Sequence, residues 1–463
     1  MIILGTNSIK DTGFDVANSA RFQNAQLLRT NSGSTSTNID KYTISVWLKR
    51  SKLGVDSNII ADTDGSNNYY QIYFKSDDTI RWQEYLSGSQ SGALITNRKF
   101  RDVGAWYNLI FRYDSSLGTA GDRMRMYVNG VEETSFSTDV NPSQNANGHF
   151  GEASSQKCIA DNNADGREYF GYMCEFMGVD GQSLAPDQFG EFDSDSGIWK
   201  PIDISGITQG VHGFYLKFED SSDLGVATLG SNWTGAGLAA TDQSTDTCTN
   251  NFCVMNPLDN FYAGNTFSEG NLKIVGKSDQ NAYNTSTFGI SNGKWYYEQK
   301  ITSTSSNGES IGITDHTATA IDDYLGDGAY EYGYYSSNGK VYNNGGNTAY
   351  GATFDTGDIM GIYIDLDNNK LYFAKNGTVQ NSGTGISITA PASTSTGFYF
   401  VSVSDNGNTG TYELNFGSPS FAISSGNTDD NGYGNFEYSP NITGDSVAKK
   451  FYALNTKNLA EYG

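Results

Sequence analysis

Several residue types are scarce in this chain of 463 residues. There are 4 cysteines, 7 prolines and 3 histidines, and 29 Lys+Arg residues stand against 52 Asp+Glu residues, which gives a net charge of −23. Four cysteines in a chain of this length are too few for a disulfide scaffold, so we expect them to be reduced. The shortage of positive charge excludes binding to nucleic acid that depends on phosphate contacts.

Long apolar segments are missing as well. No run approaches the roughly 18 to 20 residues that a membrane-spanning helix needs, so we expect no membrane insertion. The first five residues lack the basic start and the apolar length of a secretion signal. These absences predict a soluble protein that is made in a cytoplasm.

Glycine (54), tyrosine (30) and phenylalanine (25) are abundant, whereas charged residues make up only 17%. The chain is too aromatic for a disordered protein and too rich in glycine for a helical bundle. Alternating apolar residues, typical of half-buried strands, recur along it, as in residues 42–48 and 69–74. We therefore predict an all-β fold of two antiparallel, jelly-roll-like β-sandwiches in series, joined by an ordered connector.

The clearest local pattern is a hairpin at residues 122–131. The predicted inward positions are Met124, Met126 and Val128, and the predicted outward positions are Arg123, Arg125 and Tyr127. Asn129-Gly130 follows, a dipeptide that tolerates the two positive φ angles of a two-residue turn. The pattern predicts two antiparallel strands with methionines in the core.

A second strand pattern, at residues 169–176, concerns the environment of one cysteine. Strict alternation places Phe170, Tyr172, Cys174 and Phe176 on one face of the strand. Cys174 is therefore predicted to be a small residue of the core.

The order of strands in the first part of the chain resembles a known family. Residues 42–50 and 106–114 are two strand segments, and residues 125–130 add a strand that ends in Asn-Gly. This series is similar to laminin G-like, concanavalin-type jelly rolls, especially those in phage structural proteins.

The second part has a similar strand pattern and resembles another family. The segments that carry the resemblance are residues 293–298, 310–314, 357–367 and 370–377. Their order and spacing are similar to those of the SPRY domain, a β-sandwich recognition module. The two resemblances imply an N-terminal anchor segment at 1–13, a laminin G-like β-sandwich at 14–182, a connector at 183–263, a SPRY-like β-sandwich at 264–420 and a C-terminal segment at 421–463.

Tyrosine provides the main candidate contact surface. Flat aromatic faces beside hydroxyl and amide groups suit carbohydrate binding, because the rings stack on sugars while polar groups bind the hydroxyls. Tyrosine is also common in strands for packing alone, so both interpretations stay open. The candidate ligand-binding residues are Tyr330, Tyr332, Tyr335 and Tyr342 in the second part, and Trp82 and Tyr85 in the first.

Oxygen ligands gather around a glycine in the first part. Asp62, Asp64 and Asn67 are candidate ligands for calcium, which laminin G-like domains often carry near such loops. The cluster lacks the distal bidentate glutamate of an EF-hand, so a plain Asp/Gly turn is the alternative. We expect no other cofactor.

No pattern of catalytic residues stands out. The three histidines lie far apart in the sequence, and none lies near a nucleophile or zinc motif. Glu191, Asp193 and Asp195 are spaced like the acidic residues of jelly-roll glucanases. Strand-forming residues are absent between them and Ser-Gly follows, which favours a solvated turn. We predict that the protein is not an enzyme.

The paired resemblance implies a phage virion protein. On this hypothesis the chain is a tail or capsid fibre component, made in the host cytoplasm and located in the virion, that recognises a host-surface glycan or receptor protein for viral attachment. Other virion proteins are the expected partners, and a homotrimer is expected by analogy with phage fibres. The alternative is a purely structural role as a capsid decoration or tail protein that binds other virion subunits.

Overall fold

The computed structural model describes residues 8–31, 33–36, 38–64, 67–161, 166–260, 264–277, 281–304, 308–316, 324–406, 409–443 and 449–463. Most of the predicted N-terminal anchor, residues 1–7, lies outside this range. The described regular elements are strands, short 3-10 turns and one helix near the C-terminus, α1 (Thr456–Tyr462). The predicted all-β fold with antiparallel, sandwich-like sheets is confirmed. No helix in the described part is long and apolar enough to cross a membrane.

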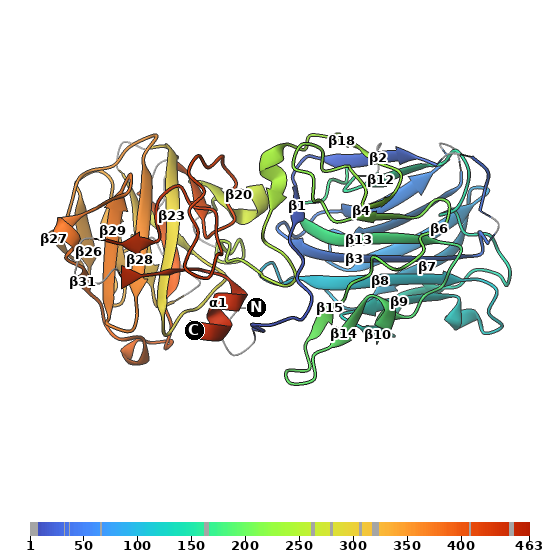
Figure 1. Ribbon diagram of the computed structural model, residues 1–463, viewed down its shortest axis with the longest axis horizontal. Helices are drawn as coiled ribbons and strands as arrows, with labels where there is room; N and C mark the ends of the chain where they lie inside the picture. The colour runs from blue at the N-terminus through green and yellow to red at the C-terminus, as the bar shows by residue number, and fades with distance from the viewer. Residues whose placement is uncertain are drawn as a thin grey trace. The chain divides into compact units, whose positions relative to one another are not determined.

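The chain divides into two compact units (Figure 1). The first unit comprises residues 12–249, and the second comprises residues 250–463 together with the start of the chain up to Asp11. Strands from residues 190–244 belong to the first unit, so much of the segment between the two strand series packs there.

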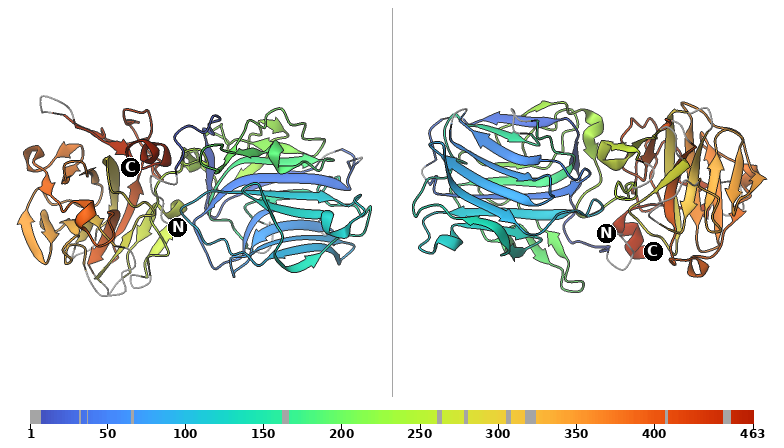
Figure 2. Two further views of the ribbon diagram at one scale, coloured as in Figure 1. Left: turned by 90° about the horizontal axis from the view of Figure 1, so that it is seen from below. Right: turned by 180° about the vertical axis from the view of Figure 1, so that it is seen from behind.

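The first unit is built from two large sheets that pack face to face (Figures 1 and 2). The order across the described part of sheet 1 is β10 (Val131–Glu133), β9 (Met124–Val128), β8 (Tyr107–Asp114), β3 (Lys41–Arg50), β13 (Gly171–Asp180), β1 (Ser19–Phe22) and β19 (Gln243–Ser244), with β16 (Phe214–Leu216) beside β13 and β17 (Leu229–Gly230) beside β16. The order across sheet 2 is β11 (Phe136–Val140), β7 (Ser89–Thr96), β6 (Ile80–Leu86), β5 (Tyr69–Phe74), β4 (Ser57–Thr63), β12 (Gln156–Ile159), β2 (Gln26–Thr30) and β18 (Thr234–Ala236). A small hairpin of β14 (Gly190–Phe192) and β15 (Trp199–Pro201) accompanies them.

The predicted hairpin of the first unit is confirmed. Met124, Met126 and Val128 are buried in the core between the two sheets. The turn residues Asn129 and Gly130 have φ angles of 49° and 74°, as a two-residue turn requires.

The outward positions of this hairpin are less exposed than alternation alone would suggest. Tyr127 points away from the core between the sheets, as predicted, but it is buried with Ile110, Met177 and Phe189. Its face of sheet 1 is covered by residues 184–207, because the chain continues over the outside of the sheet. Both faces of this strand are therefore buried.

The predicted environment of Cys174 is wrong because β13 contains a bulge. The pairing of β13 with β3 shifts register between Cys174 and Met177, and Glu175 has a φ angle of 47°. An extra residue at a bulge reverses the alternation, so Phe176 points into the core whereas Tyr172 and Cys174 pack on the outer face of sheet 1. The four cysteines are free thiols, as expected.

The second unit is also a sandwich of two sheets (Figures 1 and 2). The order across the described part of sheet 3 is β20 (Thr266–Ser268), β21 (Lys273–Val275), β33 (Thr411–Asn415), β23 (Lys294–Ser303), β28 (Ile359–Asp365), β29 (Lys370–Lys375) and β30 (Thr378–Val379), with β31 (Ile386–Ser387) beside β29 and β36 (Tyr452–Ala453) beside β23. The order across sheet 4 is β22 (Asn281–Thr285), β32 (Phe400–Asn406), β24 (Glu309–Thr314), β25 (Tyr332–Tyr335), β26 (Lys340–Asn343) and β27 (Gly346–Ala349). A short pair, β34 (Asn441–Ile442) with β35 (Lys449–Lys450), lies near the C-terminus of the chain.

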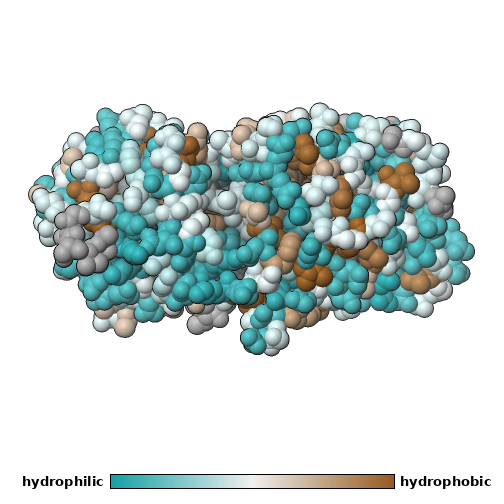
Figure 3. All heavy atoms as spheres, in the orientation of Figure 1, coloured by the Kyte–Doolittle hydropathy of each residue, from teal (hydrophilic) through white to brown (hydrophobic). Residues whose placement is uncertain are grey.

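The surface is mainly polar. Figure 3 shows hydrophilic residues over most of the visible face, with apolar residues in small separate patches. Among the described residues, the large apolar side chains that are well exposed are Val131, Val140, Phe192, Ile198, Val211 and Leu258. Single exposed apolar residues of this kind are normal for a folded protein.

Candidate functional site

The candidate functional site lies on the outer face of sheet 4, at the two described ends of the connection between β24 and β25. The structure describes the two ends of this connection, residues 315–316 and 324–331. A side chain at Gly333 would put its Cβ 2.4 Å from the carbonyl oxygen of Leu325, so the glycine allows the loop to lie directly on the strand. Leu325 itself is fully buried by this packing.

A buried carboxylate holds the second end of the loop in place. Glu331 is only 2% exposed, and its Oε2 accepts hydrogen bonds from the backbone N–H groups of Gly326 at 3.0 Å and Gly328 at 3.1 Å. Its Oε1 accepts a hydrogen bond from the Tyr283 hydroxyl at 2.8 Å. Glu331 therefore ties the loop to β22, at the far side of sheet 4.

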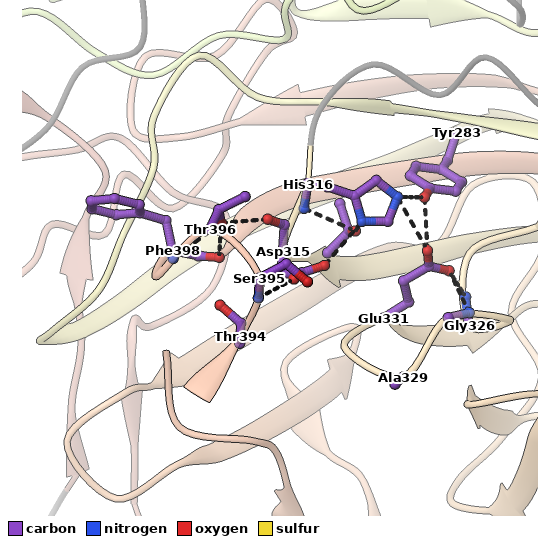
Figure 4. Close-up of polar contacts among 12 residues, drawn as sticks. Tyr283, Asp315, His316, Gly326, Ala329, Glu331, Thr394, Ser395, Thr396 and Phe398 are labelled. Atoms are coloured by element: carbon purple, nitrogen blue, oxygen red, sulfur yellow. Dashed lines mark hydrogen bonds and ion pairs between the residues drawn. The ribbon is translucent and has the colours of Figure 1, made fainter. Parts of the chain in front are cut away.

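His316 lies between this glutamate and a second acidic residue (Figure 4). Its Nδ1 is 2.9 Å from Oδ1 of Asp315, and its Nε2 is 3.4 Å from Oε1 of Glu331 and within hydrogen-bond distance of the Tyr283 hydroxyl. The histidine side chain is 41% exposed, although both carboxylates are buried. A histidine with one side open to solvent thus links the two ends of the loop.

Asp315 fixes a third segment at the same place (Figure 4). Its Oδ2 accepts a hydrogen bond from the N–H of Ser395 at 2.8 Å, and its backbone carbonyl accepts one from the Thr396 hydroxyl. Both ends of the β24–β25 connection and the segment around Ser395 are therefore held together by one polar network. Such a network keeps the surface above it in one conformation.

Three tyrosines extend this surface along sheet 4. Tyr335 is buried at the outer face, and its hydroxyl donates a hydrogen bond to the carbonyl oxygen of Leu325 at 3.2 Å. Its ring centroid lies 4.3 Å from that of Tyr342 and 6.3 Å from that of Tyr324. Tyr324 and Tyr342 are half-buried, so each exposes part of its ring beside the loop.

The four tyrosines predicted in this unit do not share one surface. Tyr335 and Tyr342 face outward, but Tyr332 points into the core, where its hydroxyl accepts a hydrogen bond from the N–H of Thr389 at 2.9 Å. Tyr330 is half-buried and packs against the same core. Alternation along β25 separates Tyr332 from Tyr335, because residues three apart in a strand lie on opposite faces.

The candidate aromatic residues of the first unit are also separated. Trp82 is fully buried in the core, and its Nε1 donates a hydrogen bond to the Tyr42 hydroxyl at 3.1 Å. Tyr85 is half-buried, with its ring stacked on Tyr69 at 4.6 Å between centroids. The ring of Trp82 is thus enclosed by the protein, and only Tyr85 reaches the surface.

The candidate calcium ligands do not fit a cation site. Asp62 is fully buried, and its Oδ2 accepts a hydrogen bond from the Lys157 ammonium group at 2.6 Å. Asp64 is exposed and bonds the side-chain amide of Asn68 at 2.6 Å, while Asn67 is exposed on the turn. A lysine therefore neutralises the one buried carboxylate of the set. Within the described residues, no group of three or more His, Cys, Asp or Glu side chains is arranged to hold a metal.

The acidic run of the first unit lies in a hairpin: Glu191 is on β14, contrary to the expected turn, and Asp193 and Asp195 are in the turn that follows. Asp193 accepts hydrogen bonds from the hydroxyl and the N–H of Ser196, and the hydroxyl contact lowers the pKa of its carboxyl. Glu191 is well exposed and lies 3.4 Å from Lys200, which is also 3.5 Å from Asp193. These contacts are those of a solvated turn rather than of a catalytic pair.

The network around His316 was not found from the sequence, where the histidines lie far apart and near no nucleophile or zinc motif. One signal was available, because Asp315-His316 directly follows the apolar strand segment Ile311–Thr314. The partner Tyr283 lies 33 residues away, so no local pattern connects it to the histidine.

Two family descriptions match the chain, one in each unit. Residues 22–179 match the concanavalin A-like lectin/glucanases superfamily, and residues 294–418 match the SPRY domain. The chain thus carries a concanavalin-like, laminin G-like domain followed by a SPRY domain.

The curated relatives are animal proteins. The chain is 33% identical over 119 residues to the Ran-binding proteins 9/10 homolog of Drosophila melanogaster, covering 24% of this chain and 12% of that protein. It is 31% identical over 131 residues to human Ran-binding protein 9, covering 26% of this chain and 18% of that protein. Across the curated relatives that it matches, the chain spans 12% to 21% of their length. Among solved structures, the SPRY domain of human HERC1 is similar at 16% identity and a TM-score of 0.29, covering 35% of this chain and 96% of that one.

These relatives overturn the predicted biological setting. The prediction of a phage virion protein is wrong, both as a fibre that recognises host-surface glycan or receptor and as a structural decoration, because the relatives are Ran-binding proteins of animals. The predicted virion location, virion partners and fibre-like trimer are corrected with it. The resemblance to phage proteins reflected shared domain types rather than a shared setting.

Proposed function

We propose that the chain is a non-enzymatic binding protein whose SPRY domain binds a segment of a cellular protein partner. The contact surface consists of His316, Tyr324 and Tyr342, on the outer face of sheet 4; we call it the outer surface. The observation that carries the proposal is the network under it, in which Glu331 and Asp315 fix the two ends of the β24–β25 connection and the segment around Ser395 beside a half-exposed histidine.

Preorganisation is the physical reason for this proposal. Binding costs less free energy when loops and side chains are already ordered, since little conformational entropy is then lost on association. Tyrosine rings supply contact area with few rotatable bonds, and Tyr342 is held further by a hydrogen bond from the side-chain amide of Asn338 at 2.9 Å. An ordered, aromatic surface with one histidine suits recognition of a peptide segment.

The names of the relatives support a protein as the ligand. Their match falls on about a quarter of this chain, and they are named for binding Ran. Purified Ran is therefore one probe for this chain, beside peptides of random sequence.

The test is selection of binders from a library of random 12-residue peptides, followed by titration of the enriched peptides against variants. We expect Tyr342→Ala combined with His316→Ala to weaken binding at least tenfold. The control is Tyr438→Ala, which removes another half-buried tyrosine of the same unit at a different place. Enriched peptides that bind the double variant as tightly as the unaltered chain, or a library that yields no binder, would contradict the proposal.

A further inference from the structure

The strand β27 forms a free edge of sheet 4 (Figure 1). It pairs with β26 from Lys340 opposite Ala349 to Asn343 opposite Gly346, and no other strand in the described ranges pairs with it. All four of its residues are exposed. An edge strand directs the N–H and C=O groups of every second residue away from the sheet. β27 therefore offers backbone hydrogen-bonding groups to a further strand.

This edge lacks three of the features that usually protect edges, although the strand is only four residues long. Its sequence Gly-Asn-Thr-Ala contains no charge and no proline, and its pairing with β26 is regular over all four pairs. By contrast, the edge strand β11 of the first unit has a register shift and carries Asp139. Charged residues, prolines and bulges within a strand discourage the addition of another strand, and β27 itself has none of them; the nearest charge is the Lys340 ammonium group of β26, which donates a hydrogen bond to the side chain of Asn347 at 3.0 Å.

A pocket of about 420 Å³ lies between β27 and the facing edge of sheet 3. Its apolar walls are Tyr332, Val341, Tyr350 and Ile386, and amide side chains of Asn343 and Asn381 contribute polar groups. None of the residues that line it is charged. Its volume is within the range of sites that bind small ligands or single large side chains.

The turn before β27 indicates which backbone groups are free. Asn344 and Gly345 have φ angles of 51° and 70°, which defines a two-residue turn of the type that closes hairpins. The pair next to such a turn is hydrogen-bonded, and hydrogen-bonded and non-hydrogen-bonded pairs then alternate. The N–H groups of Asn347 and Ala349 are thus the ones directed away from β26.

We propose that β27 and this pocket bind an extended, uncharged peptide segment of a partner protein. The segment pairs with β27 as a further strand of sheet 4 and places an apolar side chain in the pocket. The charges around the pocket favour this occupant. The net charge of −23 disfavours an acidic segment. The ammonium groups of Lys340 and Lys370, which donate hydrogen bonds to the lining residues Asn347 and Ser387, disfavour a basic one, and the pocket holds no carboxylate to pair with it. In this binding mode the main chain provides affinity and the pocket provides specificity.

The site is separate from the outer surface. Val341 and Thr348 are opposite each other on the face of sheet 4 that packs toward the core, whereas Tyr342 lies on the other face. Tyr342 is nevertheless paired with Asn347 of β27, so the independent variant is His316→Ala: His316 follows β24, three strands from β27, and binding at β27 should be unaffected by this change. Because the two sites respond to different variants, failure of the proposed strand site can be told apart from failure of the proposed function.

The test uses the full chain and a displayed library of random octapeptides that contain only uncharged residues. A selected peptide is synthesised and titrated against Thr348→Arg, which puts a charge and a long side chain at the pocket. We expect at least a tenfold loss of affinity. The matched control, Thr378→Arg, adds the same residue to β30, the edge strand of sheet 3, and should change affinity less than twofold.

Two further measurements test strand addition itself. The bound peptide should slow amide hydrogen exchange at Asn347 and Ala349 at least tenfold. Only every second amide of the bound peptide faces β27. N-methylation of that set of amides should abolish binding, and N-methylation of the other set should leave binding intact. If Thr348→Arg fails to fold, Ile386→Trp fills the pocket from the facing sheet and takes its place.

Three results would overturn the proposal. One is a peptide that binds Thr348→Arg or Ile386→Trp as tightly as the unaltered chain, and another is a library without any enriched peptide. The third is a concentration-dependent dimer in sedimentation that Thr348→Arg breaks, since β27 would then pair with a second copy of this chain.

Discussion

Replacing Glu84 by glutamine is predicted to remove a large part of the pH dependence of the first unit's stability. Glu84 lies on β6 and is fully buried in the core. Burial raises the pKa of its carboxyl to about 8, while hydrogen bonds from the Tyr42 hydroxyl and the His149 N–H partly oppose this shift. The carboxyl is therefore mostly protonated in the folded protein at pH 7.

The sign and the size of the effect follow from this pKa. The unfolded chain releases the proton near the ordinary pKa of 4.5, whereas the folded chain keeps it up to about pH 8. The free energy of unfolding therefore falls by about 1.4 kcal/mol for each pH unit across this window, or about 5 kcal/mol in all. Below pH 4.5 the stabilisation is complete, and above about pH 8 it has been lost.

The assay is urea unfolding at several pH values between 4.5 and 9, with tryptophan fluorescence as the signal that monitors unfolding. Five of the six tryptophans, Trp47, Trp82, Trp106, Trp199 and Trp233, belong to the first unit, so the signal reports mainly on it. The Glu84→Gln variant should show a slope that is shallower by up to about 1.4 kcal/mol per pH unit. At pH 9 it should be more stable than the unaltered chain. Equal slopes for the two proteins would refute the assignment of this proton to Glu84.

Three other changes have expected outcomes. Lys157→Met should lower the free energy of unfolding by about 3 to 5 kcal/mol, because it leaves the buried Asp62 carboxylate without its cation, and adding Asp62→Asn should restore part of the loss in urea unfolding. Gly130→Ala should lower the free energy of unfolding by about 2 kcal/mol or more, because φ is 74° and the new Cβ would lie 2.3 Å from the ring of Trp199. The control Gly118→Ala, which has open space around it, should lower it by less than about 0.5 kcal/mol. Calorimetry measures both. Glu331→Ala should increase the hydrogen-exchange rates of the Gly326 and Gly328 amides, which donate hydrogen bonds to Glu331, by at least tenfold as measured by NMR. Unchanged exchange rates would contradict the anchoring role of Glu331.

The fold class followed from sequence because its signals are local. Strand alternation and the Asn129-Gly130 turn are properties of a few consecutive residues, and the structure has the hairpin that they predict. Differences from expectation arose where a non-local feature decided the outcome. The bulge at Glu175 reversed the face of Phe176, and a distant segment of the chain covered Tyr127.

The candidate site was predictable only in part, for the same reason. Tyr335 and Tyr342 were identified from composition and do lie together, but Trp82 is enclosed in the core. The importance of His316 depends on Glu331 and on a tyrosine from another strand, and such contacts exist only once the chain has folded. The biological setting was wrong because domain type does not specify it.

The most direct test of the central claim is amide hydrogen exchange of the full chain with and without a peptide from the 12-residue library. The account predicts protection at residues 315–316 and 324–342, together with loss of that protection in the double variant Tyr342→Ala and His316→Ala. Protection confined to the first unit, or protection that survives in the double variant, would contradict the claim that the SPRY domain binds through its outer surface.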